Sequence, residues 1–308
     1  MKRVIIAALA LAAVVGCAKE SVTSGVSSDV VATFAGSEIG TRTTGNDWDG
    51  DENVGIYMFK EGETASSGYS LEKLNVNYTS DASGLFTVAT DVTPIYYPQS
   101  QAVDFYAYYP YSADATTNDT YTLDLTAQNT GNQGDVDFMT ASLPNQSKQT
   151  TDISFAFDHK LAMVTLVILP NNSVADLKGL SATLTGTYSS VVANVITGGV
   201  TLPEPAVTGD INFATEDLET DADTGVVSKL QATAIVAPAA LADGAKLSFS
   251  FESGQTFTAS FPDGTTFGAG DNHTFNVSMG NLEATIGVST INGWDKSEND
   301  TDGVIDAE

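Results

Sequence analysis

Cys17 is the single cysteine of this 308-residue chain, and it stands at the end of an apolar run near the N-terminus. Lys2 and Arg3 supply the positive charge that opens a secretory signal, and Val4–Val15 supply its apolar core. That core is too short to span a bilayer, for which roughly 20 residues are needed. The pattern therefore predicts a signal peptide over residues 1–16, with the chain's one thiol directly after it.

The junction Val14-Val15-Gly16-Cys17 resembles the lipobox of bacterial lipoproteins, although Val14 stands where leucine is more usual. In that motif the signal is cut before the cysteine, which is then acylated. The resemblance implies lipidation at Cys17 and an outer-membrane anchor for the precursor. An ordinary secretory signal with a chance cysteine is the alternative.

Few residues remain for catalysis. His159 and His273 are the only histidines, and His159 shares a strand face with Phe155, Phe157 and Leu161, which favours a hydrogen-bonded core histidine. No serine or threonine has an obvious histidine partner of the kind a nucleophile requires, and no H-x-x-x-H spacing for zinc occurs. We therefore expect no enzyme activity, no catalytic residue and no cofactor.

Two acidic runs have the alternation that calcium loops use. They are Asp47, Asp49 and Asp51, and Glu298, Asp300 and Asp302. The first run has Glu52 where an EF-hand loop needs its turn glycine, and the second ends before the twelfth position of such a loop. We therefore predict no metal site.

The charge of the chain is strongly negative, with 39 acidic against 12 basic residues and a formal net charge of −27. A phosphate backbone requires clustered Lys and Arg, which the sequence lacks, so nucleic acid is not an expected partner. Anionic lipid headgroups would be repelled as well. Such a charge suits an exposed surface protein that resists nonspecific association.

A run of tyrosines could stack against sugars. Its members are Tyr96, Tyr97, Tyr106, Tyr108, Tyr109 and Tyr111. Strand alternation places Tyr106 and Tyr108 on the face opposite Tyr109, so about half of the rings are expected in the core or between domains. Packing is the favoured interpretation, and a surface-anchored glycan-binding lipoprotein is the alternative function.

The elements that carry these residues alternate with a period of two, as β-strands do. Lys246–Glu252 and Gln255–Phe261 alternate on either side of Ser253-Gly254, which favours a hairpin. Further strand-like runs are Asn53–Phe59, Leu71–Tyr78, Leu85–Ala89, Val103–Tyr109, Tyr121–Leu125, Lys229–Val236, His273–Met279 and Ala284–Ile291. Beyond the signal, Val174–Leu180 is the one candidate for a short helical turn. The chain is therefore predicted to be all-β and built from sandwiches.

The longest apolar run, Ile153–Leu169, is predicted to be a central strand near the end of a first domain. Pro170 and the two asparagines after it break the run. We therefore predict a domain boundary near residue 170, within about ten residues. A chain of this length can form two such domains, each with its own core.

Four segments of the mature chain carry a family resemblance. They are Thr41–Gly45 leading through Trp48 into Val54–Tyr57, then Val103–Pro110, Phe155–Ala162 and Asn292–Trp294. In this order and behind a lipobox, they resemble the fimbrillin family, the pilins of type V pili on certain Gram-negative anaerobes. The resemblance implies two tandem transthyretin-like Greek-key β-sandwich domains, residues 43–170 and 171–308, in a fimbrial subunit that serves adhesion.

The resemblance also implies a route of assembly. A lipidated precursor reaches the cell surface, a protease removes the N-terminal segment with its first strand, and the vacated groove accepts a strand from another subunit. The expected partners are other fimbrial subunits, the outer membrane, a processing protease and a host or bacterial surface ligand. A fimbrial anchor or tip subunit is an alternative to a stalk subunit.

Arg42 is the single arginine that follows the signal peptide. It lies between Val30–Gly36, a credible first strand, and Trp48, so an arginine-specific cut would release residues 17–42 with that strand. Eight lysines follow Arg42, and folding would have to protect them from a protease that also accepts lysine. A solvated loop arginine with no role in processing is the alternative.

A donor strand is expected in the C-terminal tail, which has two short apolar runs. Ala284–Ile291 and Gly303–Ile305 are joined by a polar, acidic linker. Alternatively, Ala284–Ile291 closes the second sandwich, as a last strand commonly does.

Overall fold

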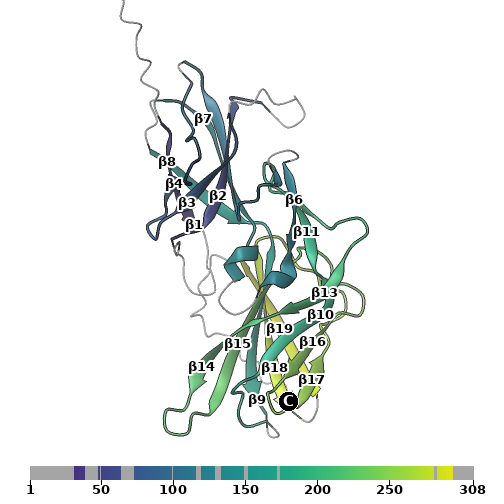
Figure 1. Cartoon of the computed structure of the whole chain (residues 1–308). Coiled ribbons are helices and arrows are strands. Elements are labelled where there is room, and N and C mark those ends of the chain that lie inside the picture. Colours follow the sequence, from purple (N-terminus) through teal and green to yellow (C-terminus); the bar gives the residue numbers. More distant parts are fainter. Residues whose placement is uncertain are drawn as a thin grey trace, which may run out of the picture.

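The computed structural model describes residues 31–38, 48, 50–63, 73–98, 100–115, 119–128, 133–148, 152–171, 174–280 and 283–293. Apart from two short 3-10 turns, the regular secondary structure of the described residues is β-strand, which confirms the all-β prediction (Figure 1). Within these ranges no helix is long and apolar enough to cross a membrane.

The first group of strands closes into a barrel in the order β1-β4-β3-β2-β5-β7-β8. Its members are β1 (Thr33–Glu38), β2 (Asn53–Lys60), β3 (Lys73–Ser80), β4 (Leu85–Val88), β5 (Val103–Tyr109), β7 (Met139–Gln146) and β8 (Asp152–His159). Alternate residues point inward and fill the barrel with apolar side chains, among them Ile56, Phe105 and Phe155. The alternation that predicted these strands therefore also packs their core.

The second group forms a nine-stranded sheet in the order β13-β10-β16-β17-β19-β18-β9-β15-β14, in the lower half of Figure 1. Its members are β9 (Ala162–Pro170), β10 (Ser181–Tyr188), β13 (Thr208–Asn212), β14 (Ala214–Thr220), β15 (Val227–Val236), β16 (Lys246–Ser250), β17 (Thr256–Ala259), β18 (Asp271–Gly280) and β19 (Glu283–Gly293). β19 pairs along its length with β18, whereas its pairing with β17 is confined to Glu283 and Thr258 among the described residues.

The prediction of one central strand over Ile153–Leu169 is wrong. The run contains two strands, β8 and β9, and Lys160-Leu161 carries the chain between them from the barrel to the nine-stranded sheet. Continuous apolar sequence concealed this change, because both strands are buried in their own sheets. The boundary near residue 170 stays a prediction, while the strands change sheets about ten residues earlier.

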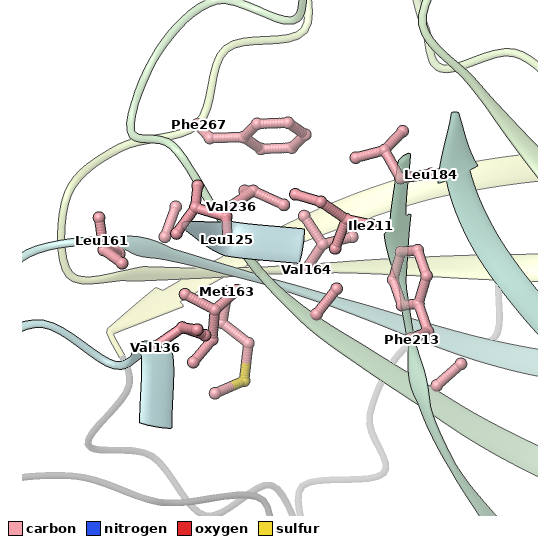
Figure 2. Packing of buried hydrophobic residues seen from close by; sticks show 14 of the residues in the cluster. Leu125, Val136, Leu161, Met163, Val164, Leu184, Ile211, Phe213, Val236 and Phe267 are labelled. Atoms are coloured by element: carbon pink, nitrogen blue, oxygen red, sulfur yellow. The ribbon is translucent and has the colours of Figure 1, made fainter. Parts of the chain in front are cut away.

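A connecting segment, defined here as residues 119–128 and 133–138, leaves the barrel between β5 and β7 and packs in the second core. It contains β6 (Thr120–Asp124) and two 3-10 turns, Leu125–Ala127 and Gln133–Val136. β6 pairs with β11 (Ser190–Asn194), which in turn pairs with β12 (Val200–Thr201). Figure 2 shows Leu125 and Val136 of this segment among Met163, Val164 and Val236.

Two buried glutamines fasten the connecting segment to β15. The Ile235 amide donates to Gln128 Oε1 at 2.7 Å, and Gln128 Nε2 donates to the Ile235 carbonyl at 2.6 Å. Gln133 bonds in a similar way to the carbonyl and hydroxyl of Thr233. The side-chain amides thus satisfy backbone groups that a neighbouring strand would otherwise satisfy.

No helix forms over Val174–Leu180, where a turn hydrogen bond joins the Leu180 amide to the Leu177 carbonyl.

Candidate assembly site

β1 is one of the strands of the barrel wall, where it lies between β4 and β8. It pairs in parallel with β8 over six residues, from Thr33 opposite Asp152 to Glu38 opposite Phe157. On its other side it pairs antiparallel with β4 through Phe34 and Ala35. β1 is therefore an integral strand of the barrel.

On the inward face of β1, Phe34 packs among aromatic rings, and its side chain is 1% exposed. The Phe34 ring meets Tyr78 and Phe105 edge to face at 5.2 and 5.1 Å and stacks on Phe155 at 5.7 Å. Buried aromatic pairs in these geometries add about 0.5–1.5 kcal/mol each beyond the burial of their area. Phe34 is consequently the principal apolar anchor of β1.

Gly36 fits where a larger residue would not. A Cβ built on Gly36 would lie 2.5 Å from the tip of the Phe86 ring and 3.2 Å from Trp48. The Trp48 indole donates a hydrogen bond to the Gly36 carbonyl at 3.1 Å, and the Gly36 amide donates to the Gly84 carbonyl at 2.8 Å. Trp48 itself packs edge to face against Phe86 and Phe157.

β8 depends on β1 for most of its strand pairing. On its other edge β8 pairs with β7 at Met139–His159 and Thr140–Asp158, and the described residues show no further pairs between the two strands. From Asp152 to Phe157, the neighbouring strand is β1. Loss of β1 would expose an apolar groove and leave much of β8 without a strand partner.

Tyr78 packs against Phe34 on the inward face of β1. Burial raises the pKa of Tyr78 to about 12, and the hydrogen bond that its oxygen accepts from the Ile95 amide partly opposes this rise. The Tyr78 ring touches Phe34, so β1 forms part of the apolar environment responsible for the shift.

The predicted processing sites flank β1 in the sequence. Arg42 falls within residues 39–47, between the end of β1 and Trp48, and that segment lies outside the described residues. Cys17 and the tail run Gly303–Ile305 also lie outside them. Ala284–Ile291, by contrast, belongs to β19 and pairs with β18.

Both histidines of the chain, His159 and His273, are buried in the fold. His159 is buried and its Nδ1 lies 2.9 Å from Asp137 Oδ1, which confirms the prediction of a hydrogen-bonded core histidine. Burial lowers the pKa of His273, and the charge of Asp271 opposes that shift.

No group of three or more potential metal ligands occurs in the described ranges. Of the two acidic runs, only Asp51 lies within them.

Half of the tyrosine run is buried. Tyr108 is fully inaccessible, Tyr97 and Tyr109 are nearly so, and Tyr96 is 37% exposed. Tyr108 and Tyr121 pack in the second core at 6.0 Å from each other, whereas Tyr109 faces the barrel interior. Three of the six rings are thus buried, which agrees with the prediction that about half would pack in the core, while Tyr106 and Tyr111 are partly buried.

Sequence reasoning missed the closest constraints on β1. The contacts of Gly36 with Phe86 and Trp48 depend on the register between strands far apart in the chain. Glycine at an inward position of a strand was the available signal, because such a glycine often marks a close approach of other atoms.

The described residues form an all-β fold in which β1 is an internal strand of the barrel. The fimbrillin-like family profile matches residues 41–294, and the chain belongs to this family of fimbrial subunits. It is therefore a structural subunit rather than an enzyme. A candidate fimbrium subunit of Bacteroides uniformis, Fim1C, is 28% identical over 273 residues, covering 84% of this chain and 83% of that relative.

Solved structures agree on the fold. A crystal structure of a candidate cell adhesion protein from Bacteroides uniformis has a TM-score of 0.67 and 26% identity, covering 87% of this chain and 99% of the other. A second, from Bacteroides ovatus, has a TM-score of 0.67 and 18% identity, covering 86% and 98%. The latter likeness concerns the fold alone.

Proposed function

We propose that the chain is a pilin precursor that is lipidated at Cys17, cut after Arg42 and assembled into adhesive fimbriae by strand exchange. Lipidation delivers the precursor to the outer membrane and the cell surface. Cleavage then removes residues 17–42, which contain the lipid and β1. Other subunits of the fimbria are the partners in assembly.

The position of β1 is the observation that carries this proposal. A cut at Arg42 separates an internal strand from the barrel that contains it, whereas Trp48 stays with the barrel. The vacated site would combine unpaired backbone along β8 with the apolar pocket of Phe34. Such a groove binds an added strand through backbone hydrogen bonds and selects it through alternate side chains. Keeping β1 in place before cleavage also prevents premature aggregation through an open edge.

The donor is assigned to the tail beyond β19. Since Ala284–Ile291 already pairs with β18, the remaining apolar run of the tail is Gly303–Ile305. Deletion of residues 295–308 should abolish polymerisation while the monomer still folds, because β19 ends at Gly293. Normal fibres from the deletion variant would show that the donor lies elsewhere.

Mass spectrometry of fimbriae sheared from cells that express the full chain tests the processing step. The expected mature N-terminus is Thr43, and Arg42→Ala should prevent maturation and fibre formation. Lys148→Ala is a matched control, because it removes a positive charge from an exposed position after β7. Assembled protein whose N-terminus is still Cys17 would contradict the proposal.

A further inference from the structure

We propose that His273 acts as a pH-sensitive switch for the loop between β17 and β18, residues 260–270. While the imidazole is neutral, the loop is held against the point where the chain crosses from the barrel to the nine-stranded sheet. A proton on His273 releases the loop. Neither β1 nor the tail beyond β19 takes part, so this switch does not depend on cleavage at Arg42 or on strand exchange.

The β17–β18 loop reaches the crossing through Gly270. The Gly270 amide donates a hydrogen bond to the Leu161 carbonyl at 2.7 Å, and Leu161 is one of the two residues between β8 and β9. A Cβ built on Gly270, whose φ is +74°, would lie 3.2 Å from the His159 carbonyl oxygen. Glycine adopts this φ without strain and lets the loop come close to the last residue of β8.

The apolar side of the loop packs in the same region. Phe267 is buried, and its amide donates a hydrogen bond to the Ala239 carbonyl at 3.0 Å. Figure 2 shows its ring in the cluster that contains Leu125 of the connecting segment and Leu161 of the crossing. Phe267 also packs edge to face against Phe261 at 6.0 Å. Displacement of this loop would therefore loosen the packing between the second core and the crossing.

His273 holds the loop from strand β18. Its side chain is buried, and its Nε2 accepts a hydrogen bond from the Gly268 amide at 3.2 Å. The imidazole also packs edge to face with the Phe267 ring at 5.2 Å. Because a backbone amide can only donate, Nε2 has to be unprotonated in this arrangement, and the neutral ring carries its proton on Nδ1.

A proton on Nε2 removes the hydrogen bond between Gly268 and His273. Both nitrogens of an imidazolium ion are donors, so the Gly268 N–H would face a second N–H group. The new positive charge would also be buried, which is unfavourable. Movement of the loop away from His273 relieves both effects, because the imidazolium ion then reaches water.

Asp271 is the charged group that acts on His273. Its negative charge favours the imidazolium ion, whereas burial has the larger effect and lowers the pKa of His273. The register neighbours of His273 are Val164 on β9 and Ile291 on β19, which do not titrate. Asp263 belongs to the loop and is exposed to solvent. The closed loop therefore favours the neutral form of His273.

The open loop becomes more populated as the pH falls below about 6.5. With the loop open, His273 binds a proton near pH 6.5, the ordinary value for histidine. With the loop closed, the lowered pKa of His273 delays protonation to a lower pH. Each pH unit below about 6.5 therefore shifts the equilibrium toward the open loop by up to about tenfold, until the closed form also binds a proton.

Hydrogen exchange followed by mass spectrometry tests the switch at about pH 7.5 and about pH 5.5, in protein purified from cells that express the full chain. Protection is measured relative to intrinsic exchange at the same pH, which removes the direct effect of pH on exchange. Residues 266–270 should lose protection about two- to tenfold at the lower pH. Residues 103–109 of β5 lie in the barrel and should keep their protection, so they serve as the reference.

His273→Gln separates the titration from the hydrogen bond. The glutamine side-chain oxygen can accept from the Gly268 amide but does not titrate, so the loop should keep its protection at both pH values. The matched control is His159→Gln, which replaces the other histidine of the chain and should retain the wild-type response of the loop. A loss of protection in His273→Gln equal to that of the wild type would overturn the role of His273.

Asp271→Asn tests the direction of the effect. Removal of its charge should lower the pKa of His273 further, so the loop should open at a lower pH than in the wild type. Opening at a higher pH would contradict the proposed switch.

An NMR titration of the wild-type chain needs no substitution, because the chain has two histidines whose ring signals can be followed separately. The pKa of His273 should lie below the ordinary value of about 6.5, and loss of loop protection should follow its titration. A pKa of His273 at or above about 6.5 would refute the switch. Loop protection that does not change as His273 titrates would refute it as well.

Discussion

Replacing Phe34 with alanine should loosen β1 more than any other single truncation in that strand. Phe34 is 1% exposed and contacts three aromatic rings, so the variant loses both buried area and ring packing. Phe→Ala changes in well-packed cores cost about 3–5 kcal/mol. The intact precursor should lose about this much unfolding free energy from its barrel.

The effect becomes more informative after cleavage. Once the chain is cut at Arg42, β1 is held by noncovalent contacts alone, and each 1.4 kcal/mol corresponds to about a tenfold change in its binding constant. A loss of 3–5 kcal/mol therefore predicts about a hundredfold to several-thousandfold weaker retention of the 17–42 peptide. The wild-type peptide should stay in its groove until a donor strand displaces it.

Native mass spectrometry of purified, Arg42-cleaved protein can measure the retained peptide against time. Val31→Ala is the matched control, because Val31 lies on the same segment but is 42% exposed. The control should change stability by no more than about 0.5 kcal/mol. Equal retention of the peptide by wild type and Phe34→Ala would refute the anchoring role of Phe34, and so would an equally large effect of Val31→Ala.

Three further results are expected. The pKa of Tyr78 is raised to about 12 in the fold. The stability that neutral Tyr78 contributes is therefore complete below about pH 10 and is lost between about pH 10 and 12. Removal of β1 should shift the tyrosinate absorbance titration of Tyr78 toward about pH 10. Gln128→Ala removes the side-chain amide that hydrogen-bonds the Ile235 amide and carbonyl, and it should lower the unfolding free energy by about 1–3 kcal/mol in denaturant titrations. An unchanged unfolding midpoint would show that water replaces the Gln128 side-chain amide. Gly55→Ala would place a Cβ 2.1 Å from the Tyr108 ring, and calorimetry should show destabilisation of about 1–3 kcal/mol; a variant as stable as wild type would mean that this ring relaxes freely.

The strands with strict alternation could be predicted closely from the sequence. Val103–Tyr109 is β5 with the same bounds, and Asn53–Phe59 matches β2 within one residue. β14 could not be found in this way, because it is an edge strand rich in acidic and threonine residues and most of its side chains are exposed. Charged edge strands discourage pairing between molecules, and the same property removes their hydrophobic signal.

The site was predictable in outline only. The first strand and its nearness to Arg42 can be read from the sequence, because both are local features. The neighbours of β1 cannot, since the parallel pairing with β8 joins residues more than a hundred positions apart. The packing of the connecting segment was hidden for a related reason: Gln128 and Gln133 look like solvent-exposed residues until the fold brings β15 beside them.

The connecting segment also has a mechanical consequence. In a fibre assembled as proposed, tension enters each subunit through the barrel groove and leaves through the tail after β19, so it must cross between the two cores. Besides the covalent step at Lys160-Leu161, the pairing of β6 with β11 and the hydrogen bonds of Gln128 to β15 join the connecting segment to the second core, so these contacts share that tension. A subunit fastened in this way should resist extension better than two domains joined by a flexible linker.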